Sequence, residues 1–287
     1  MVNSFEIIDS HVHTFSSDDV AEKIISSFNK IYDIEFTNPG NGTIANVLAN
    51  MKLGGIDRTI MANFAPPKII DDNNMWTLGA AKASDGKLVP LVSFHPEMGG
   101  AIQEHLDRYI ALGAKGIKLH PMAQGFDVRD TRLDELYSKC SEYSFAILIH
   151  CGRVSNARLN EYSDIECILP IIDKYPKLTI VLAHMADGSV ERVLEISKKY
   201  NNVYFDTSIV ITGYSEIIRV NEPSWLVDNE VVAVINEIGA DKVIFGSDFP
   251  WGSPIPDLKR VMKLKLTDEQ KRLIFSENTK RIFKLNL

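Results

Sequence analysis

Cysteine is scarce in this sequence and shows no pairing pattern. The 287 residues contain three cysteines, Cys140, Cys151 and Cys167, and none of them lies in a CxxC spacing. An odd, scattered set argues against a disulfide framework and against a zinc site built from cysteine. We therefore expect a protein of the reducing cytoplasm whose chemistry depends on other side chains.

Long apolar runs and an excess of basic charge are also missing. No apolar stretch approaches the roughly 18 residues that a membrane span needs, and the first residues have neither the basic start nor the apolar core of a secretory signal. The 31 lysines and arginines are scattered and are outnumbered by 38 acidic residues, whereas nucleic-acid binding leaves a basic footprint. We expect a small-molecule substrate, no nucleic acid and no membrane; apolar residues in the insertions described below would suit a homodimer.

What the sequence does contain is a regular alternation of buried strands and amphipathic segments. Apolar residues make up 45% of the chain and charged residues 24%, the balance of a globular protein with a full-sized core. Eight short runs rich in Val, Ile and Leu predict βα units and a parallel sheet. The runs are 6–12, 58–63, 88–94, 116–119, 146–149, 179–183, 203–207 and 243–246. Since a (β/α)8 barrel needs about 250 residues, we expect one such TIM barrel as a single domain over residues 1–287.

Two connections in this pattern are longer than an ordinary βα loop. The first, Thr14 to Ile56, has room for helices over 18–31 and 43–53, and the second runs from Ile209 to Pro223. Both follow a strand, so both are expected at the C-terminal mouth of the barrel, as lid or specificity loops. Near the end of the chain, Thr267-Asp268-Glu269-Gln270 is a capping-box pattern that predicts the start of a helix.

Polar residues gather where the predicted strands end. His11 and His13 are two positions apart, so on a strand they point to the same face and can bind one ion together. Six of the seven histidines lie at such strand ends, namely His11, His13, His95, His120, His150 and His184. Catalytic residues of α/β barrels come from these ends. Asp9 and Asp206 either point inward beside the ion or support one of its ligands.

These residues carry a resemblance to a known family. The HxH after the first strand, the histidines after strands five and six and the aspartate after strand eight resemble the amidohydrolase superfamily. The fragments GIKLHP, LIHCG, LAHM and FGSDFPWG resemble its amidohydrolase 2 branch, which contains hydrolases, lactonases and decarboxylases related to aminocarboxymuconate-semialdehyde decarboxylase. The resemblance implies that the principal metal is held by His11, His13, His150 and Asp248. It also implies that His184 orients water, polarises the substrate or binds a second metal.

The remaining candidates keep two interpretations each. Lys118 sits where binuclear members of the superfamily carry a carboxylated lysine, and the alternative is an amine that binds a substrate carboxylate or a buried acid. His95 and His120 either line the pocket or are satisfied structural histidines. Arg153 could clamp a substrate carboxylate, and Trp251 could wall the pocket. Cys151 has the opposite strand parity to His150, which favours a core thiol over a nucleophile.

The resulting hypothesis is a metal-dependent hydrolase that attacks an ester, lactone or amide of a small, carboxylate-bearing molecule through a metal-activated water. One Zn²⁺ is the expected ion, with a second ion, Mn²⁺ or Fe²⁺ as alternatives. Asp248 would move the proton and His184 would stabilise the oxyanion. The family resemblance leaves open a metal-dependent decarboxylase of an aromatic or unsaturated acid. A noncatalytic barrel with a structural zinc is a third hypothesis, which the surplus of polar groups at one mouth disfavours.

Overall fold

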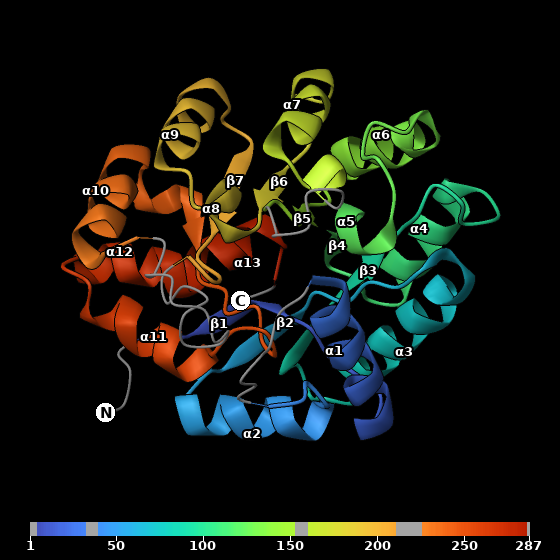
Figure 1. Cartoon of the computed structure of the whole chain (residues 1–287), viewed down its shortest axis with the longest axis horizontal. Helices are drawn as coiled ribbons and strands as arrows, with labels where there is room; N and C mark the ends of the chain where they lie inside the picture. The colour runs from blue at the N-terminus through green and yellow to red at the C-terminus, as the bar shows by residue number, and fades with distance from the viewer. Residues whose placement is uncertain (1–4, 33–39, 153–159, 211–225, 286–287) are drawn as a thin grey trace.

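Eight parallel strands form a barrel with helices around it, viewed in Figure 1. The computed structural model describes residues 5–32, 40–152, 160–210 and 226–285. The strands follow one another around the sheet in chain order. They are β1 (Ile8–Val12), β2 (Arg58–Met61), β3 (Leu88–Ser93), β4 (Gly116–Leu119), β5 (Ile147–Ile149), β6 (Ile180–Leu182), β7 (Val203–Asp206) and β8 (Val243–Ile244). The (β/α)8 barrel predicted from the sequence is confirmed.

Backbone hydrogen bonds between the first strand and the segment after the last close the barrel. Ser10 N donates to Phe245 O at 2.9 Å, and His13 N donates to Phe249 O at 2.7 Å. Strand β8 is shorter than the run 243–246 suggested, because the chain beyond Ile244 turns into the loop that makes these closing contacts. The loop between β8 and the next helix is thereby tied to β1.

Side chains alternate between the barrel interior and the layer beneath the helices. On β5, Leu148 packs with Ile8, Ile60 and Val181 inside the barrel, whereas Ile147 and Ile149 pack beneath the helices. Both faces are covered, which is why the strands are almost continuously apolar. Lys118 pairs in register with Leu148 and is fully buried, so a cation lies at an interior position of β4.

The helices surround the strands, and the two predicted in the first long connection, 18–31 and 43–53, are found within one residue of their expected ends. The helical segments are α1 (Asp18–Tyr32), α2 (Ile44–Gly54), α3 (Ile70–Lys82), α4 (Ile102–Ala111), α5 (Pro121–Gln124), α6 (Asp134–Tyr143), α7 (Ile165–Lys174), α8 (His184–Asp187), α9 (Val190–Lys199), α10 (Asp228–Ile238), α11 (Pro254–Lys263), α12 (Asp268–Arg272) and α13 (Asn278–Ile282). The predicted capping box is present, since Thr267 and Gln270 exchange side-chain to backbone hydrogen bonds. Within the described ranges, no helix combines the length and apolarity that a membrane span requires.

The first long connection supplies the two helices expected of it, α1 and α2. Helix α1 lies beside α3 in Figure 1, and its Ala21 packs into a small cluster with Phe15 and Trp251, beside Phe28. An apolar face of α1 therefore meets the mouth of the barrel near His13. Of the second insertion, 211–223 falls outside the described residues.

Candidate metal centre

His11, His13 and Asp248 come together at the mouth of the barrel. His13 Nε2 lies 3.1 Å and His11 Nε2 lies 3.3 Å from the same oxygen, Asp248 Oδ1. The two histidines share a face because successive strand residues alternate, and Asp248 N donates to His11 O at 2.8 Å, which fixes the carboxylate opposite them. All three residues are buried. Their ligand atoms lie within 4.8 Å of one another, a spacing that could hold a metal ion.

Asp206, at the end of β7, orients the ring of His11. His11 Nδ1 lies 2.9 Å from Asp206 Oδ2. Burial alone would raise the pKa of Asp206, but its interactions with His11, His184 and Ser208 outweigh burial and lower it to about 2. An ionised carboxylate can only accept, so His11 carries its proton on Nδ1. The lone pair on His11 Nε2 then faces Asp248 and is available to a metal.

The same carboxylate controls the ring of His184. Ser208 Oγ donates to Asp206 Oδ1, and His184 Nδ1 lies 2.8 Å from Ser208 Oγ and 3.3 Å from Ser208 O. Because the hydroxyl proton is spent on Asp206, both oxygens of Ser208 accept, and His184 therefore carries its proton on Nδ1. Asp206 Oδ1 also accepts from the backbone N–H groups of His184 and Ser208. The group His11–His184–Asp206, although its spacing could hold a metal ion, is thus occupied by internal hydrogen bonds.

His150 continues this chain of ring contacts. Its Nδ1 lies 3.2 Å from His184 Nε2, which has a lone pair, so His150 Nδ1 donates. The other nitrogen, His150 Nε2, is then a buried lone pair, and it has no hydrogen-bond partner among the described residues. A buried acceptor without a partner points to a group that binds there. His150 lies outside the 4.8 Å group of His11, His13 and Asp248.

Left-handed backbone marks two of these positions. Asp248 has a φ of 60°, and α8 is a turn in which His184, Met185, Ala186 and Asp187 all have positive φ. Non-glycine residues with such angles cost free energy, and they gather at active and ligand sites. This tight turn follows β6 and brings the His184 ring within hydrogen-bond distance of Ser208.

Asp9 binds the loop that carries Asp248. Asp9 Oδ2 accepts from Ser247 Oγ at 2.6 Å and Oδ1 accepts from Ser247 N at 3.0 Å. Burial raises the pKa of Asp9 to about 7, against the lowering effect of these hydrogen bonds. Since Ser247 precedes Asp248, these contacts hold in place the loop that carries the Asp248 carboxylate. Of the two interpretations of Asp9, this geometry favours the supporting one.

Lys118 is a buried cation beside the histidines. Its Nζ lies 2.9 Å from His11 Nε2, the nitrogen that also faces Asp248. Burial lowers the pKa of Lys118 to about 8, while Asp248 and Asp206 partly oppose that shift. Its carboxylation, and with it a second metal, stays a prediction.

The electrostatics of the centre suit a divalent cation. Burial lowers the pKa of His13 to about 4 and lowers that of His150 well below its usual value, so both imidazoles are neutral at pH 7. Burial acts to raise the pKa of Asp248, but His11 and His13 hold it well below its usual range. Neutral imidazoles with one carboxylate are a ligand set used by Zn²⁺, Mn²⁺ and Fe²⁺. The donors of this centre therefore fit the ion that the family resemblance implies.

Of the other candidate residues, His120 lies at the centre, whereas His95 and Cys151 have structural surroundings. His95 uses both ring nitrogens on backbone groups, Gln124 O at 3.2 Å and Glu97 N at 3.0 Å, the pattern of a structural histidine. His120 stacks on His150 with ring centroids 3.9 Å apart, so it stands at the centre. Cys151 is buried in the core beneath the helices. Arg153 lies outside the described residues.

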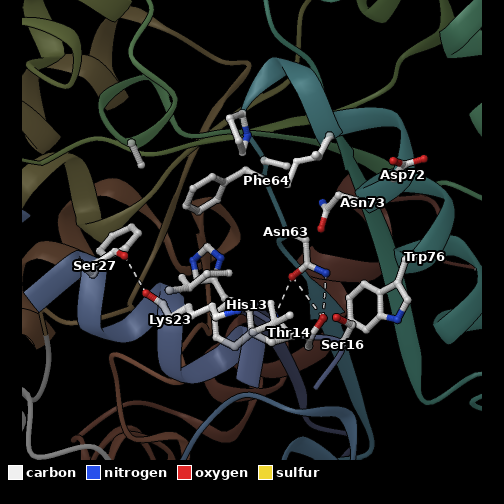
Figure 2. Close-up of a pocket in the computed structure, with 18 of the residues that line it drawn as sticks. His13, Thr14, Ser16, Lys23, Ser27, Asn63, Phe64, Asp72, Asn73 and Trp76 are labelled. Carbon is white, nitrogen blue, oxygen red and sulfur yellow. Dashed lines mark hydrogen bonds between the residues drawn. The ribbon is translucent and has the colours of Figure 1, made fainter. Parts of the chain in front are cut away.

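Trp251 borders a cavity of about 680 Å³ that opens beside His13. The cavity lies between α1 and α3, and its remaining lining comes from the loops after β1, β2 and β8 and from Ala123 of α5. Figure 2 shows Lys23 and Ser27 of α1 on one side, Asn73 and Trp76 of α3 on the other, and His13 and Phe64 between them. The predicted wall formed by Trp251 is thus part of a larger apolar chamber.

Sequence reasoning did not find two of the residues that shape the centre, Ser208 and Ser247. Each adjoins a singled-out aspartate, Ser208 two residues after Asp206 and Ser247 directly before Asp248. Serine near a strand end is common, so its position alone carries no signal. What identifies both serines is the carboxylate that each one contacts.

Comparison with known proteins places this geometry in a family. The family model described as Amidohydrolase, of the amidohydrolase 2 type, matches residues 8–285. The chain is 22% identical over 245 residues to 4-sulfomuconolactone hydrolase from Hydrogenophaga intermedia, covering 80% of this chain and 75% of that enzyme. It is 26% identical over 123 residues to gamma-resorcylate decarboxylase from Polaromonas sp., and this match covers 40% of the chain and only 37% of that enzyme.

The solved structures agree on the fold. A 5-carboxyvanillate decarboxylase from Novosphingobium aromaticivorans, solved with bound manganese, superposes with a TM-score of 0.73 at 15% identity and covers 98% of each chain. The relatives thus include both hydrolases and decarboxylases, and a likeness at this identity shows the barrel alone. Because the family model spans nearly the whole sequence, the chain belongs to the amidohydrolase 2 family of enzymes.

Proposed function

We propose that this protein is a metal-dependent hydrolase of an ester, lactone or amide bond in a small molecule. The observation that carries the proposal is the single carboxylate oxygen of Asp248 set between the Nε2 atoms of His11 and His13. This arrangement places one base, Asp248, beside two neutral imidazole ligands in a buried part of the barrel mouth. The hydrolase match supports the proposal, since it covers twice the share of this chain that the decarboxylase match covers, 80% against 40%.

The ion would be held by His11, His13 and Asp248, with His150 as the fourth ligand through its unpartnered Nε2. When bound, a divalent ion supplies Lewis-acid chemistry: it lowers the pKa of water and polarises a carbonyl. We propose one Zn²⁺, because imidazole and carboxylate donors suit it. Mn²⁺ is the alternative, supported by the manganese in a structural relative.

Different residues of the chain transfer the proton and stabilise the negative charge that develops on the substrate. Asp248, ionised and facing the histidines, accepts the proton of the attacking water and returns it to the leaving group. The ring nitrogens of His184 are spent on Ser208 and His150, so His184 has no N–H left for a developing oxyanion. The Lys118 ammonium, buried 2.9 Å from His11 Nε2, is the better placed group for that charge. His184 then acts by holding His150.

Decarboxylation is the second candidate, and the resorcylate decarboxylase match favours it. Loss of CO2 from an aromatic acid leaves a carbon that must be protonated, so it needs an acid where hydrolysis needs a base. Burial keeps His13 and His150 neutral, which leaves Lys118 as the nearby cationic acid. Hydrolysis needs a base, and Asp248 is already ionised, whereas decarboxylation needs an acid and His13 and His150 are neutral. The protonation states of the site therefore suit hydrolysis better.

The test is a substrate panel on the protein reconstituted separately with Zn²⁺, Mn²⁺ and Fe²⁺. Aryl esters, lactones and anilides are compared with hydroxybenzoic acids, with acid release followed by pH-stat and CO2 by gas analysis. We expect acid release from an ester or lactone that stops on chelation and returns with metal. CO2 release without any hydrolysis would replace the proposal by the second candidate.

A further inference from the structure

The cavity between α1 and α3 is far larger than the reacting bond requires. Its volume is about 680 Å³, whereas a cavity of about 150 Å³ already accommodates benzene. It reaches the metal centre through His13, which is both a lining residue and a neighbour of Asp248. Whatever fills the cavity therefore lies next to the reacting group.

Aromatic rings form a continuous wall from α1 to the metal centre. Phe28 lies 4.6 Å from Trp251, and Trp251 lies 4.9 Å from His13, both measured between ring centroids. The Phe64 ring also lies against His13, with ring centroids 5.4 Å apart. Flat side chains at these separations offer faces and edges on which a ring system can stack.

Three polar residues of the lining, Thr14, Asn63 and Ser27, already have hydrogen-bond partners. Thr14 N donates to Asn63 Oδ1 at 2.7 Å, and Asn63 Nδ2 donates to Thr14 Oγ1 at 2.8 Å, as Figure 2 shows. Ser27 Oγ donates to Lys23 O at 2.7 Å. These groups therefore make no demand on a ligand.

Two buried donors in the lining have no partner among the described residues, Asn73 Nδ2 and Trp251 Nε1. Both are N–H groups that lack an acceptor oxygen, which a ligand in the cavity could supply. The only charged side chains in the described lining, Lys23 and Asp72, are exposed and opposite in sign. For a substrate with several anionic groups, the cavity offers one exposed cation, Lys23, and the exposed Asp72 carboxylate would repel it. The lining therefore disfavours a polyanionic ligand.

We propose that this cavity binds the body of the substrate, and that this body is an uncharged ring system larger than one ring with a neutral oxygen acceptor. The inference rests on the proposed function only in placing the reacting carbonyl at His13; the ligand class follows from the lining. Substrates with two carboxylates fit this cavity poorly, so the proposed ligand differs from the carboxylate-bearing molecule expected from the sequence. An aryl or polycyclic ester or lactone fits it.

The experiment measures binding separately from catalysis. The probe is 2-acetonaphthone, a neutral two-ring ketone that can be neither hydrolysed nor decarboxylated, and phthalate is the dianionic comparison. Each is titrated by calorimetry into the zinc-loaded protein. We expect the ketone to bind at least tenfold more tightly than phthalate. Equal or tighter binding of phthalate would overturn the proposal.

Adjacent serines of α1 offer a matched pair of variants. Ser27 lines the cavity and Ser26 does not, although both are exposed residues of the same helix. Ser27→Trp should fill the cavity and weaken ketone binding at least tenfold, while Ser26→Trp should leave it unchanged. Ketone binding that is the same in both variants would place the ligand elsewhere.

A second variant keeps the cavity intact. Trp251→Phe retains a ring but removes the unpartnered N–H, so it should reduce the preference for 2-acetonaphthone over 2-ethylnaphthalene at least threefold. An unchanged preference would contradict the role of this donor. Binding of the ketone without turnover of any ester would defeat the hydrolase proposal alone, and turnover of small esters without ketone binding would defeat this inference alone.

Discussion

Asp206 Oδ2 lies 2.9 Å from the Nδ1 of His11, although 195 positions of sequence separate the two residues. The contact joins the end of β7 to β1 across the barrel mouth. It selects which ring nitrogen of His11 faces Asp248, because an ionised carboxylate accepts and does not donate. Asp206 thus orients the ring of His11, the residue that we propose as a metal ligand.

Replacing Asp206 by Asn should weaken metal binding about 10- to 100-fold, the usual effect of losing such a supporting carboxylate. An amide has one acceptor oxygen in place of two, and it cannot serve His11, His184 and Ser208 together. Affinity for Zn²⁺ and Mn²⁺ would be measured by competition with a chromogenic chelator. Asp241→Asn, at an exposed site outside the centre, is the control, and equal affinities in the two variants would contradict this role.

The hydrogen bonds also fix the tautomers of three rings. We expect the metal-free protein at pH 7.5 to carry its imidazole protons on the Nδ1 atoms of His11, His184 and His150. Long-range ¹H–¹⁵N spectra of the histidine rings distinguish this tautomer from the Nε2–H form. A protonated Nε2 on His150 would break the proposed chain, because that nitrogen would then have no lone pair for an ion.

The barrel could be predicted from the sequence because its signals are local. Buried parallel strands are apolar on both faces, so runs such as Ile147–Ile149 stand out without any knowledge of their neighbours. The spacing of His11 and His13 places both on one face for the same reason, and the structure brings Asp248 to them.

Other features depend on contacts between distant segments and could not be predicted. The role of Ser208 follows from the position of Asp206 relative to the left-handed turn at His184. The cavity is lined by α1 and α3, and hydrophobic periodicity does not predict how two helices that follow different strands lie relative to each other. The ring nitrogens of His95 are satisfied by backbone groups, which strand parity does not reveal.

Gly246 makes room for His11. A Cβ added at Gly246 would lie 2.9 Å from the His11 Cβ, closer than real side chains approach. Gly246→Ala should therefore displace His11, lower metal affinity at least tenfold and reduce the free energy of unfolding by about 1–3 kcal/mol. Gly79→Ala in α3, where an added Cβ meets nothing within 4 Å, should instead stabilise by up to ~1 kcal/mol. Urea denaturation and chelator competition measure both; unaltered affinity in Gly246→Ala would show that the loop adjusts.

Asp248→Asn is the sharpest test of the proton transfer. Asp248 has a φ of 60°, and asparagine tolerates this left-handed conformation well, so the variant should keep the backbone and the fold. It should retain some metal yet lose about 10²- to 10⁴-fold in kcat, the usual contribution of general acid–base catalysis. The metal content of each sample is measured beside its kcat on the best ester substrate. Full activity in the variant would defeat the assignment of Asp248 as the base.

Glu6 links both ends of the chain, at the opposite end of the barrel from the metal centre. Its carboxylate contacts Arg58 at 2.6 Å, where β2 begins, and Lys280 of α13 at 2.5 Å. Burial raises the pKa of Glu6, but hydrogen bonds from Lys280 and Arg58 outweigh it, so the pKa lies below the ordinary value of 4.5. A lowered folded-state pKa means that the contribution is present above pH 4.5 and is lost as the pH falls through the folded value.

Glu6→Gln should therefore lower the free energy of unfolding by about 1 kcal/mol at pH 7, a figure kept small because the pair is partly exposed. The difference from the parent protein should shrink as the pH falls from 4.5 through the lowered folded-state pKa of Glu6. Urea is the denaturant, because guanidinium salt would screen the ion pairs. Glu269→Gln, which removes an exposed pair with Arg272 within one helix, should cost only a few tenths of a kcal/mol. A deficit in Glu6→Gln that stays the same from pH 7 down to the lowest pH at which both proteins remain folded would show that packing, and not charge, is what Glu6 contributes.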